Sequence, residues 1–169
     1  KLFFIYQGDF IKQLGIYDLV ISAGKEYGFE IVEFTKIQPN PRHSDVQEGI
    51  DLCRQEQCDV ILVAGGGSAI DSAKAIASGV LIDAPIWDVV LGKYPVVNSL
   101  PLLTISTVSA TGSEMNNGAV ITYGDGKFPV FSSLVFPKFS MLDPTLTFTL
   151  PEKQVKNGVI DTFVHTTEQ

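Results

Sequence analysis

The stretch DVILVAGGGSAIDSAKAIA, residues 59–77, contains the change of pattern that decides the fold. Its first part, residues 59–64, is a mainly apolar run typical of a strand that is covered on both faces of a sheet. Three consecutive glycines follow, and a helix is predicted to begin near Ser68, because residues then recur on one helical face: Ile70, Ala73 and Ala77. The stretch therefore predicts a buried strand, a tight glycine loop and a helix.

Strands and helices alternate on both sides of this stretch. Apolar runs predict further strands at residues 2–6, 30–34 and 101–107. A helix is expected over roughly residues 16–27, with Gly28 as its C-terminal cap. Another is expected after Ser44, which has capping-box spacing with Gln47 and is followed by apolar residues at helical spacing: Val46, Ile50 and Cys53. This alternation predicts an α/β fold, a parallel sheet with helices on both faces.

The pattern changes after Gly112. Residues 119–131 predict a hairpin with an Asp125-Gly126 turn, and a short strand is expected within residues 139–151. From Glu152 the pattern is helical to the last residue. We therefore expect an α/β domain over about residues 1–150, and over 151–169 the first helix of a helical domain that continues in a longer chain.

Composition excludes several classes of partner. The chain has 169 residues, of which 45% are hydrophobic, and a net charge of −7. The negative charge argues against nucleic acid or an anionic membrane as the main partner, because both attract basic surfaces, and no apolar run approaches the roughly 18 residues that span a bilayer. Cys53 and Cys58 are the only cysteines. We interpret them as reduced thiols of a cytoplasmic protein.

The glycine loop, residues 65–67, is a candidate anion site. Glycines let backbone amides approach a ligand, and the N-terminus of the following helix adds partial positive charge. Ligands of open α/β sheets also bind at the carboxyl ends of strands. The spacing matches neither the common dinucleotide motif nor a P-loop. A pyrophosphate site and an ordinary strand-to-helix turn both remain possible interpretations.

A second polar loop, residues 106–118, follows the predicted strand at 101–107. Short hydroxyl side chains are concentrated in it: Ser106, Thr107, Ser109, Thr111 and Ser113. Such hydroxyls can bind ribose or adenine without filling a cleft. An ordinary Ser/Thr-rich turn, with Ser113 and Glu114 at the start of a helix, explains the composition equally well.

The last predicted helix contains a candidate metal site. Asp161 and His165 are four residues apart, so both side chains lie on one helical face and can reach one cation. Glu168 lies three residues further along, where it could orient His165. The alternative is a solvated helix face with a chance pairing of acid and imidazole.

Four motifs occur in an order and at a spacing that resemble one family: GGGSAIDSAKAIA (65–77), TGSE (111–114), LDPTLTFTLP (142–151) and NGVIDTFVHTTEQ (157–169). The family is the iron-containing (group III) alcohol dehydrogenases, especially the butanol-dehydrogenase-like branch, and the resemblance covers essentially the whole chain. It implies a Rossmann-like cofactor domain followed by a helical metal-binding domain. It also implies hydride transfer between NAD or NADP and a small aldehyde or primary alcohol, with a divalent metal, iron or zinc.

The resemblance implies a cofactor site spread over several segments. It assigns the pyrophosphate to Gly66, Gly67 and Ser68. It assigns the adenosine and ribose pocket to Thr107, Thr111 and Ser113. Asp71 would lie near the nicotinamide, and Lys127 would reach the ribose.

The same resemblance makes Asp161 and His165 the first two of four metal ligands, and so the candidate catalytic residues. The other two would be histidines further along, so we expect the 169-residue piece alone to be inactive. The metal would act as a Lewis acid on the carbonyl oxygen. For the intact protein we expect a homodimer.

The choice between NAD and NADP stays open. After the first strand the chain reads Gln7-Gly8-Asp9-Phe10, where NADP-using relatives tend to have a glycine- and serine-rich turn. The lack of an acid at Gly8 resembles NADP users, but Asp9 would repel a 2′-phosphate. Two alternative functions also remain: a glycerol or diol dehydrogenase of the same superfamily, and a nucleotide-binding module without catalysis.

Overall fold

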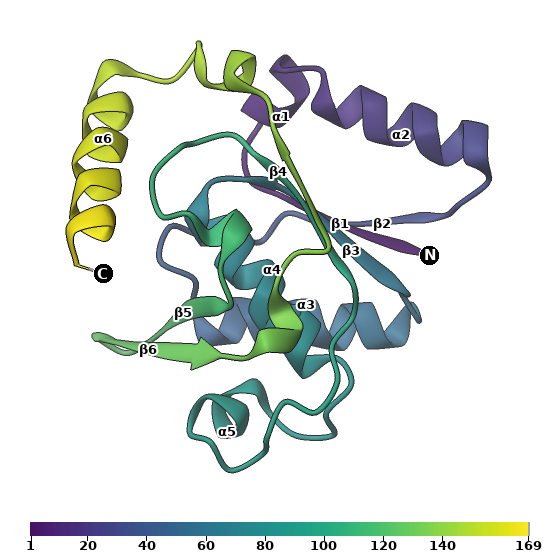
Figure 1. Cartoon of the computed structure of the whole chain (residues 1–169). Coiled ribbons are helices and arrows are strands. Elements are labelled where there is room, and N and C mark those ends of the chain that lie inside the picture. Colours follow the sequence, from purple (N-terminus) through teal and green to yellow (C-terminus); the bar gives the residue numbers. More distant parts are fainter. Residues whose placement is uncertain (169) are drawn as a thin grey trace.

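The computed structural model describes residues 1–168 and is built around a five-stranded parallel sheet (Figure 1). The strand order is β2-β1-β3-β4-β7, and every neighbouring pair is parallel. The strands are β1 (Leu2–Tyr6), β2 (Ile31–Phe34), β3 (Val60–Gly65), β4 (Leu102–Ser106) and β7 (Phe139–Leu142). The predicted α/β class is confirmed.

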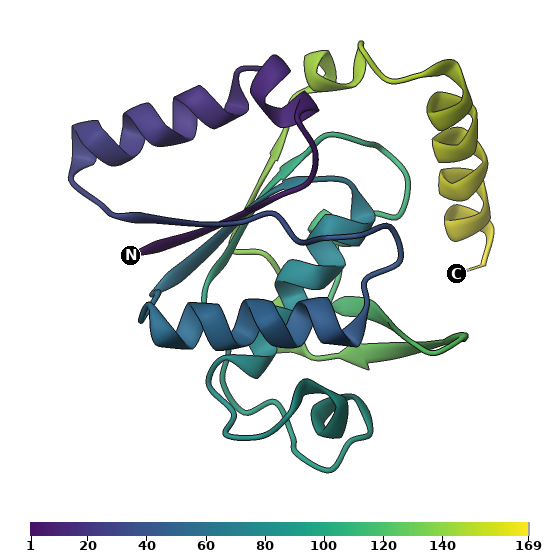
Figure 2. The ribbon, with the colours of Figure 1, turned by 180° about the vertical axis from the view of Figure 1, so that it is seen from behind.

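Helices cover both faces of the sheet, as Figures 1 and 2 show from opposite sides. On one face lie α1 (Phe10–Gln13) and α2 (Ile16–Tyr27). On the other lie α3 (His43–Gln55) and α4 (Gly67–Gly79), and α5 (Ile86–Val90) packs against these two helices away from the sheet. The predicted bounds of α2 are confirmed, and Gly28 caps it in the left-handed region at φ 72°. The prediction of two covered faces therefore holds.

Strand β1 shows why its sequence is apolar throughout. Phe3 and Ile5 point into the core formed with α3 and α4, whereas Leu2, Phe4 and Tyr6 point into the core formed with α1 and α2. Successive side chains of a strand face opposite sides, so a strand between two helical layers needs apolar residues at every position. All five residues are buried.

The predicted capping box at the start of α3 is wrong. The helix begins at His43, and Arg42 occupies the N-cap position without a side-chain hydrogen bond. The Ser44 hydroxyl instead donates to Asp45, and the Gln47 side-chain oxygen accepts a 2.8 Å hydrogen bond from the Ile86 amide. The Gln47 side chain, which would close a capping box, therefore makes a tertiary contact with α5 instead.

A small antiparallel hairpin packs beside α4. It consists of β5 (Gly118–Tyr123) and β6 (Gly126–Phe131), so the hairpin at 119–131 is confirmed. Its two-residue loop is Gly124–Asp125, one residue earlier than the predicted Asp125-Gly126 turn. Gly124 has φ +57°, which a glycine adopts without strain.

Three 3-10 turns complete the connections: η1 (Ser113–Met115), η2 (Ser133–Val135) and η3 (Pro144–Thr147). The last helix, α6 (Glu152–Thr167), runs apart from the sheet at the yellow end of the chain (Figures 1 and 2). It begins where the sequence predicts. Its predicted final residue, Gln169, lies outside the described residues. Within residues 1–168, no helix is long and apolar enough to cross a bilayer.

Candidate active site

A cavity of about 590 Å³ lies where β1, β3 and β4 end. Gln7 and Phe10 enter it from the segment after β1, the glycine loop from the end of β3, and Thr107 from the end of β4. The segment from η3 to the first turn of α6 forms another wall: Leu146, Thr149, Leu150, Pro151 and Gln154. Parallel strands bring their carboxyl ends to one edge, so distant segments meet here.

The glycine loop places the first turn of α4 at this cavity. Gly66 is the N-cap residue of α4, and the first i to i−4 bond of the helix is donated by the Ile70 amide to the Gly66 oxygen at 3.1 Å. The amides of Gly67 and Ser68 precede that bond, and amides at this position lack an intrahelical acceptor. Gly66, Gly67 and Ser68 all line the cavity. This arrangement can bind an anion such as a pyrophosphate.

Gly67 is held against the second polar loop. A Cβ atom at Gly67 would lie 2.6 Å from the Thr111 hydroxyl oxygen, which is too close for any side chain. A Cβ at Gly66 would lie 3.3 Å from Val108. Glycine at these positions therefore permits close packing between the two loops that the sequence singled out.

Thr107 supplies an unpaired polar atom beside the cavity. Its side chain is fully buried and lines the cavity, and its hydroxyl has no hydrogen-bond partner within residues 1–168. Its amide donates to the Gly65 oxygen at 3.1 Å, which ties the end of β4 to the glycine loop. Buried hydroxyls are nearly always satisfied, so a polar ligand in the cavity fits this side chain.

Asp71 and Ser113 form a contact of their own and are absent from the lining of this cavity. The Ser113 hydroxyl donates to one Asp71 oxygen at 2.6 Å, and the Val120 amide donates to the other at 3.0 Å. Burial raises the pKa of Asp71, and these two hydrogen bonds oppose that shift. The pair joins α4 to η1 and β5, a role in positioning that the sequence did not suggest.

Four other predicted cofactor residues also lie outside the lining. Thr111 packs behind Gly67 and accepts a 3.2 Å hydrogen bond from the Ser113 amide. Gly8, at φ +76°, and Asp9 stand between β1 and α1, next to the two lining residues of that segment. Lys127 is an exposed residue of β6.

The sequence missed several lining residues: Pro39, Ala69, Val108, Leu146, Thr149, Leu150, Pro151 and Gln154. Some of them belong to motifs that were recognised, but their types are not specific for a site. Gln154 is the informative one, because it extends from α6 into the same cavity as the glycine loop. No local pattern could have revealed this, since it depends on how α6 docks.

Asp161 and His165 lie side by side on α6. The His165 Nε2 atom is 3.7 Å from the Asp161 Oδ1 atom, and both side chains are about half exposed. Metal bonds of about 2.0–2.2 Å place neighbouring ligand atoms roughly 3–3.5 Å apart, so a small rotation would let both bind one cation. A carboxylate and an imidazole suit iron or zinc. The pair therefore fits part of a metal site.

No third ligand joins this pair in the described chain. Residues 1–168 contain no group of three histidine, cysteine or acidic side chains that could hold an ion. Glu168 is the C-cap residue of α6, and within the same residues no hydrogen bond or ion pair connects its side chain to His165. Its predicted role in orienting His165 stays a prediction.

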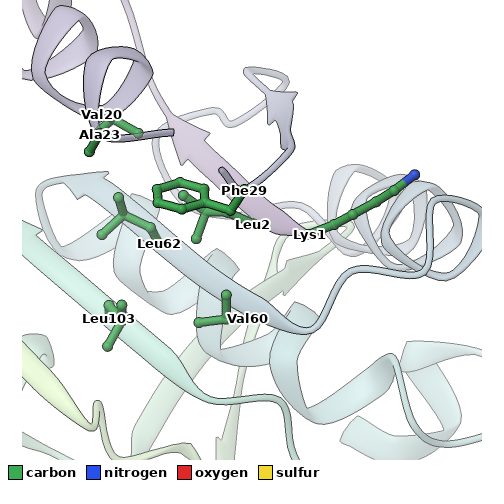
Figure 3. Close-up of a pocket in the computed structure, with 8 residues that line it drawn as sticks. All are labelled: Lys1, Leu2, Val20, Ala23, Phe29, Val60, Leu62 and Leu103. Atoms are coloured by element: carbon green, nitrogen blue, oxygen red, sulfur yellow. The ribbon is translucent and has the colours of Figure 1, made fainter. Parts of the chain in front are cut away.

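A second hollow, of about 350 Å³, lies near the amino ends of the strands (Figure 3). In Figure 3, Val20 and Ala23 of α2 face Leu62 and Leu103 of the sheet. The lining is apolar apart from Lys1. Because it offers no set of polar groups to orient a substrate, the cavity at the glycine loop is the better candidate site.

Comparison with known proteins gives consistent matches over nearly the whole chain. The family model described as "Iron-containing alcohol dehydrogenase" matches residues 1–144. A probable NADH-dependent butanol dehydrogenase of Bacillus subtilis is 44% identical over 167 residues, 98% of this chain and 43% of that protein. The NADPH-dependent aldehyde reductase YqhD of Escherichia coli is 39% identical over 175 residues, covering 100% of this chain and 44% of the reductase.

Solved structures of related proteins also match this chain. The crystal structure of NADH-dependent butanol dehydrogenase A from Thermotoga maritima matches with a TM-score of 0.94 and 42% identity. The match covers 99% of this chain and 42% of that one. This chain thus spans less than half the length of the relatives it matches.

Proposed function

The chain belongs to the iron-containing alcohol dehydrogenase family, and we propose that the intact protein transfers a hydride between NAD(P)H and an aldehyde or primary alcohol. The proposal assigns the nucleotide to the cavity at the glycine loop and a divalent metal to Asp161 and His165. One observation carries it. Helix α6, which holds the Asp161–His165 pair, extends Gln154 into the same cavity as Gly66 and Gly67.

The nucleotide side of the site uses backbone more than side chains. The amides of Gly67 and Ser68, at the start of α4, would bind the pyrophosphate, with the helix dipole favouring its charge. The buried Thr107 hydroxyl would donate to or accept from the ribose or base. Thr111 and Ser113 would act indirectly, because they hold the second loop against the glycine loop.

The metal side of the site uses Asp161 and His165. Asp161 would contribute negative charge and His165 a neutral imidazole nitrogen to a shared ion, iron or zinc. When bound, such an ion polarises the carbonyl oxygen of the substrate as a Lewis acid. Two ligands are fewer than the three that catalytic centres of this kind usually take from the protein. We therefore assign the remaining ligands to other parts of the intact protein.

Apolar side chains form the wall between the two halves of the site. Val108, Leu146 and Leu150 line the cavity, and Val108 also borders the hollow between the second loop and α6. An apolar wall excludes water from the path of the hydride and strengthens the electrostatic interactions there. These residues would hold the nicotinamide and the substrate carbon in contact without offering a competing proton donor.

The segment after β1 has features that suit NADH and features that suit NADPH. Gln7 and Phe10 line the cavity, and neither carries a positive charge for a 2′-phosphate. Asp9 adds a nearby negative charge, which favours NADH. Gly8 leaves room for the phosphate, which favours NADPH. The relatives include proteins named for each cofactor.

Three finer points belong to the same proposal: iron as the native metal, a cytoplasmic location and a homodimer. The free, buried thiols of Cys53 and Cys58 suit a reducing compartment. Elemental analysis and sedimentation of the intact protein would test the metal and the oligomeric state.

Steady-state assays of the intact protein with butanal, lactaldehyde and glycerol, each with both cofactors, test the function. We expect reduction of butanal and a bound divalent metal. Turnover of glycerol or lactaldehyde alone would favour a polyol dehydrogenase. Cofactor binding without metal or turnover would favour a nucleotide-binding module.

A further inference from the structure

We propose that Gly158 is a positioning residue: its missing side chain lets α6 rest on the loop after β4, and this contact sets where Asp161 and His165 stand relative to the cofactor cavity. The inference rests on the proposed function, which assigns the metal to α6 and the nucleotide to the cavity. It adds a residue that touches neither group and acts through the helix.

Gly158 is the buried residue of α6, whereas its neighbours in the described part of the helix are exposed or half-buried. A Cβ atom at Gly158 would lie 2.5 Å from the Ser109 carbonyl oxygen and 3.8 Å from the Ala110 Cβ. The first distance is shorter than any real Cβ contact, and the obstacle is backbone, which cannot rotate away. The helix can approach the loop this closely only with glycine at position 158.

The glycine is unfavourable for the helix by itself. Gly158 sits in the middle of a 16-residue helix, where glycine costs about 0.5–1 kcal/mol relative to alanine. Its backbone is not in the left-handed region, so no turn requires it. The close approach to Ser109 is the feature of the structure that explains it, and a Cα–H···O contact to that carbonyl fits the geometry.

A second contact lies one helical turn further along. The Thr162 hydroxyl donates to the Ala110 carbonyl oxygen at 3.3 Å. Gly158 and Thr162 are four residues apart and therefore lie on one face of α6. Two consecutive carbonyl groups of the loop thus contact two consecutive turns of the helix.

This face of α6 is also the face of the metal pair. Asp161 follows Gly158 by three residues and His165 follows it by seven, or nearly two full turns, so both lie close to the face of Gly158. A displacement of α6 at Gly158 would consequently carry Asp161 and His165 with it. The pair cannot keep its place if the helix is pushed off the loop.

The other side of the loop is fixed to the cofactor site. The Thr107 amide donates to the Gly65 oxygen, Val108 lies against Gly66, and Thr111 lies against Gly67. The loop between them therefore contacts the glycine loop on one side and α6 on the other. Because it is in contact on both sides, it acts as a spacer between the pyrophosphate site and the Asp161–His165 pair.

The test compares Gly158→Ala and Gly158→Val with the parent in the intact protein. We expect the kcat for butanal reduction to fall about tenfold or more, because small misplacements of reacting groups have effects of this size. The Kd for NADH and the metal content should stay within about twofold of the parent values, a separation that general unfolding would not produce. Lys156→Ala, on an exposed position of the same helix, should leave all three unchanged.

Thermal unfolding gives a readout that does not depend on activity. At a free helical position Gly→Ala raises Tm, whereas the contact with Ser109 predicts that Gly158→Ala lowers it. An unchanged kcat with a raised Tm would overturn the inference. If Gly158→Val fails to fold, variants of Thr162 provide the test. Thr162→Val should lower kcat about threefold, whereas Thr162→Ser, which keeps the hydroxyl, should have the kcat of the parent. Equal kcat values in the two variants would contradict the positioning role.

The same experiment separates this inference from the proposed function. If the parent binds metal and reduces butanal while Gly158→Ala does so equally well, the function stands and the positioning role fails. If the parent holds no metal and transfers no hydride, the proposed function fails, and a lowered Tm of Gly158→Ala still supports the contact while a raised one overturns it.

Discussion

The Ser113 hydroxyl donates a 2.6 Å hydrogen bond to the Asp71 carboxylate across 42 residues of sequence. The other carboxylate oxygen accepts from the Val120 amide. One turn further along α4, the Lys74 ammonium donates to the Asn116 side-chain oxygen at 2.7 Å and to the Gly118 carbonyl at 2.8 Å. Helix α4 therefore carries the glycine loop at its start and holds the second loop and the beginning of β5 with two charged side chains.

Replacing Asp71 by asparagine should weaken this connection. The carboxylate accepts from both Ser113 and Val120, whereas an amide has one oxygen and turns its NH2 group toward the second donor. We expect a loss of about 1–3 kcal/mol in the free energy of unfolding, measured by urea titration. Asp125→Asn, at the exposed hairpin loop, is the matched control. An Asp71→Asn protein as stable as that control would show that the hydrogen bonds of Asp71 to Ser113 and Val120 do not stabilise the fold.

Lys74 predicts a pH dependence of stability. Burial lowers its pKa from 10.5 to about 8, with the nearby Asp71 charge opposing the shift. Between about pH 8 and 10.5 the folded protein has lost this proton while the unfolded chain retains it. The unfolded state then binds more protons, so this group makes the protein more stable as pH rises through that window. Below pH 8 both states are protonated, and the penalty for burying the charge is fully present.

The pH effect is measured as the free energy of unfolding between pH 7 and 10.5. The contribution of Lys74 should be up to roughly 3 kcal/mol, and Lys74→Met should lack this rise. Lys25→Met, in which an exposed lysine of α2 is replaced, should keep the pH profile of the parent. Parallel profiles for the parent and Lys74→Met would show that Lys74 titrates normally.

Gly66→Val should block the pyrophosphate site. A Cβ atom there would lie 3.3 Å from Val108, so a branched side chain would extend toward the proposed nucleotide site. We expect the Kd for both NADH and NADPH to rise at least about tenfold, or about 1.4 kcal/mol, with the fold retained. Ala23→Val adds bulk to the apolar hollow in Figure 3 instead and should bind both cofactors normally. Unchanged affinity in Gly66→Val would remove this loop from the site.

Asp9 should influence the choice of cofactor. Its neighbours Gln7 and Phe10 line the cavity, and its own side chain makes no capping hydrogen bond with α1. Asp9→Asn removes a negative charge without changing shape, so NADPH should bind about fivefold more tightly, roughly 1 kcal/mol, while NADH binding changes little. Asp18→Asn, on α2, controls for net charge. Equal effects of the two substitutions on both cofactors would place the 2′-phosphate elsewhere.

The order of the elements could be predicted from the sequence because buried strands and helices have characteristic patterns of apolar residues. The five apolar residues of β1 and the helical spacing of Val46, Ile50 and Cys53 each reflect a core that the structure confirms. The start of α6 at Glu152 could be predicted as well, because a polar helical pattern begins directly after Pro151. Fold class therefore needed only short-range information.

Features that depend on tertiary contacts could not be predicted. Gln47 has the spacing of a capping box, but its side chain bonds to Ile86. The resemblance implies that Asp71 lies near the nicotinamide, but its hydrogen bonds with Ser113 and Val120 leave no local signal in the sequence. Gln154 carries no local signal at all. In each case the partner lies more than 30 residues away or on an element whose docking the sequence does not encode locally.

The glycine loop and the Asp161–His165 pair were recognisable for a different reason. Their chemistry requires particular residue types at a fixed spacing, so the pattern is visible before the fold is known. The structure adds what spacing could not, namely that Gln154 of the same helix lines the cavity at the glycine loop and that Gly158 lies against the Ser109 carbonyl.

Metal analysis of His165→Ala beside a titration with nicotinamide cofactor tests the central claim most directly. The intact parent should hold about one divalent metal per chain. His165→Ala should lose the metal and aldehyde reduction but bind NADH or NADPH with the affinity of the parent, because the proposed nucleotide contacts belong to the glycine loop and the end of β4. His43→Ala is the matched control, since that imidazole packs 4.3 Å from the Tyr123 ring, and it should keep metal and activity. A His165→Ala protein that retains its metal and reduces aldehyde at the parent rate would contradict the account.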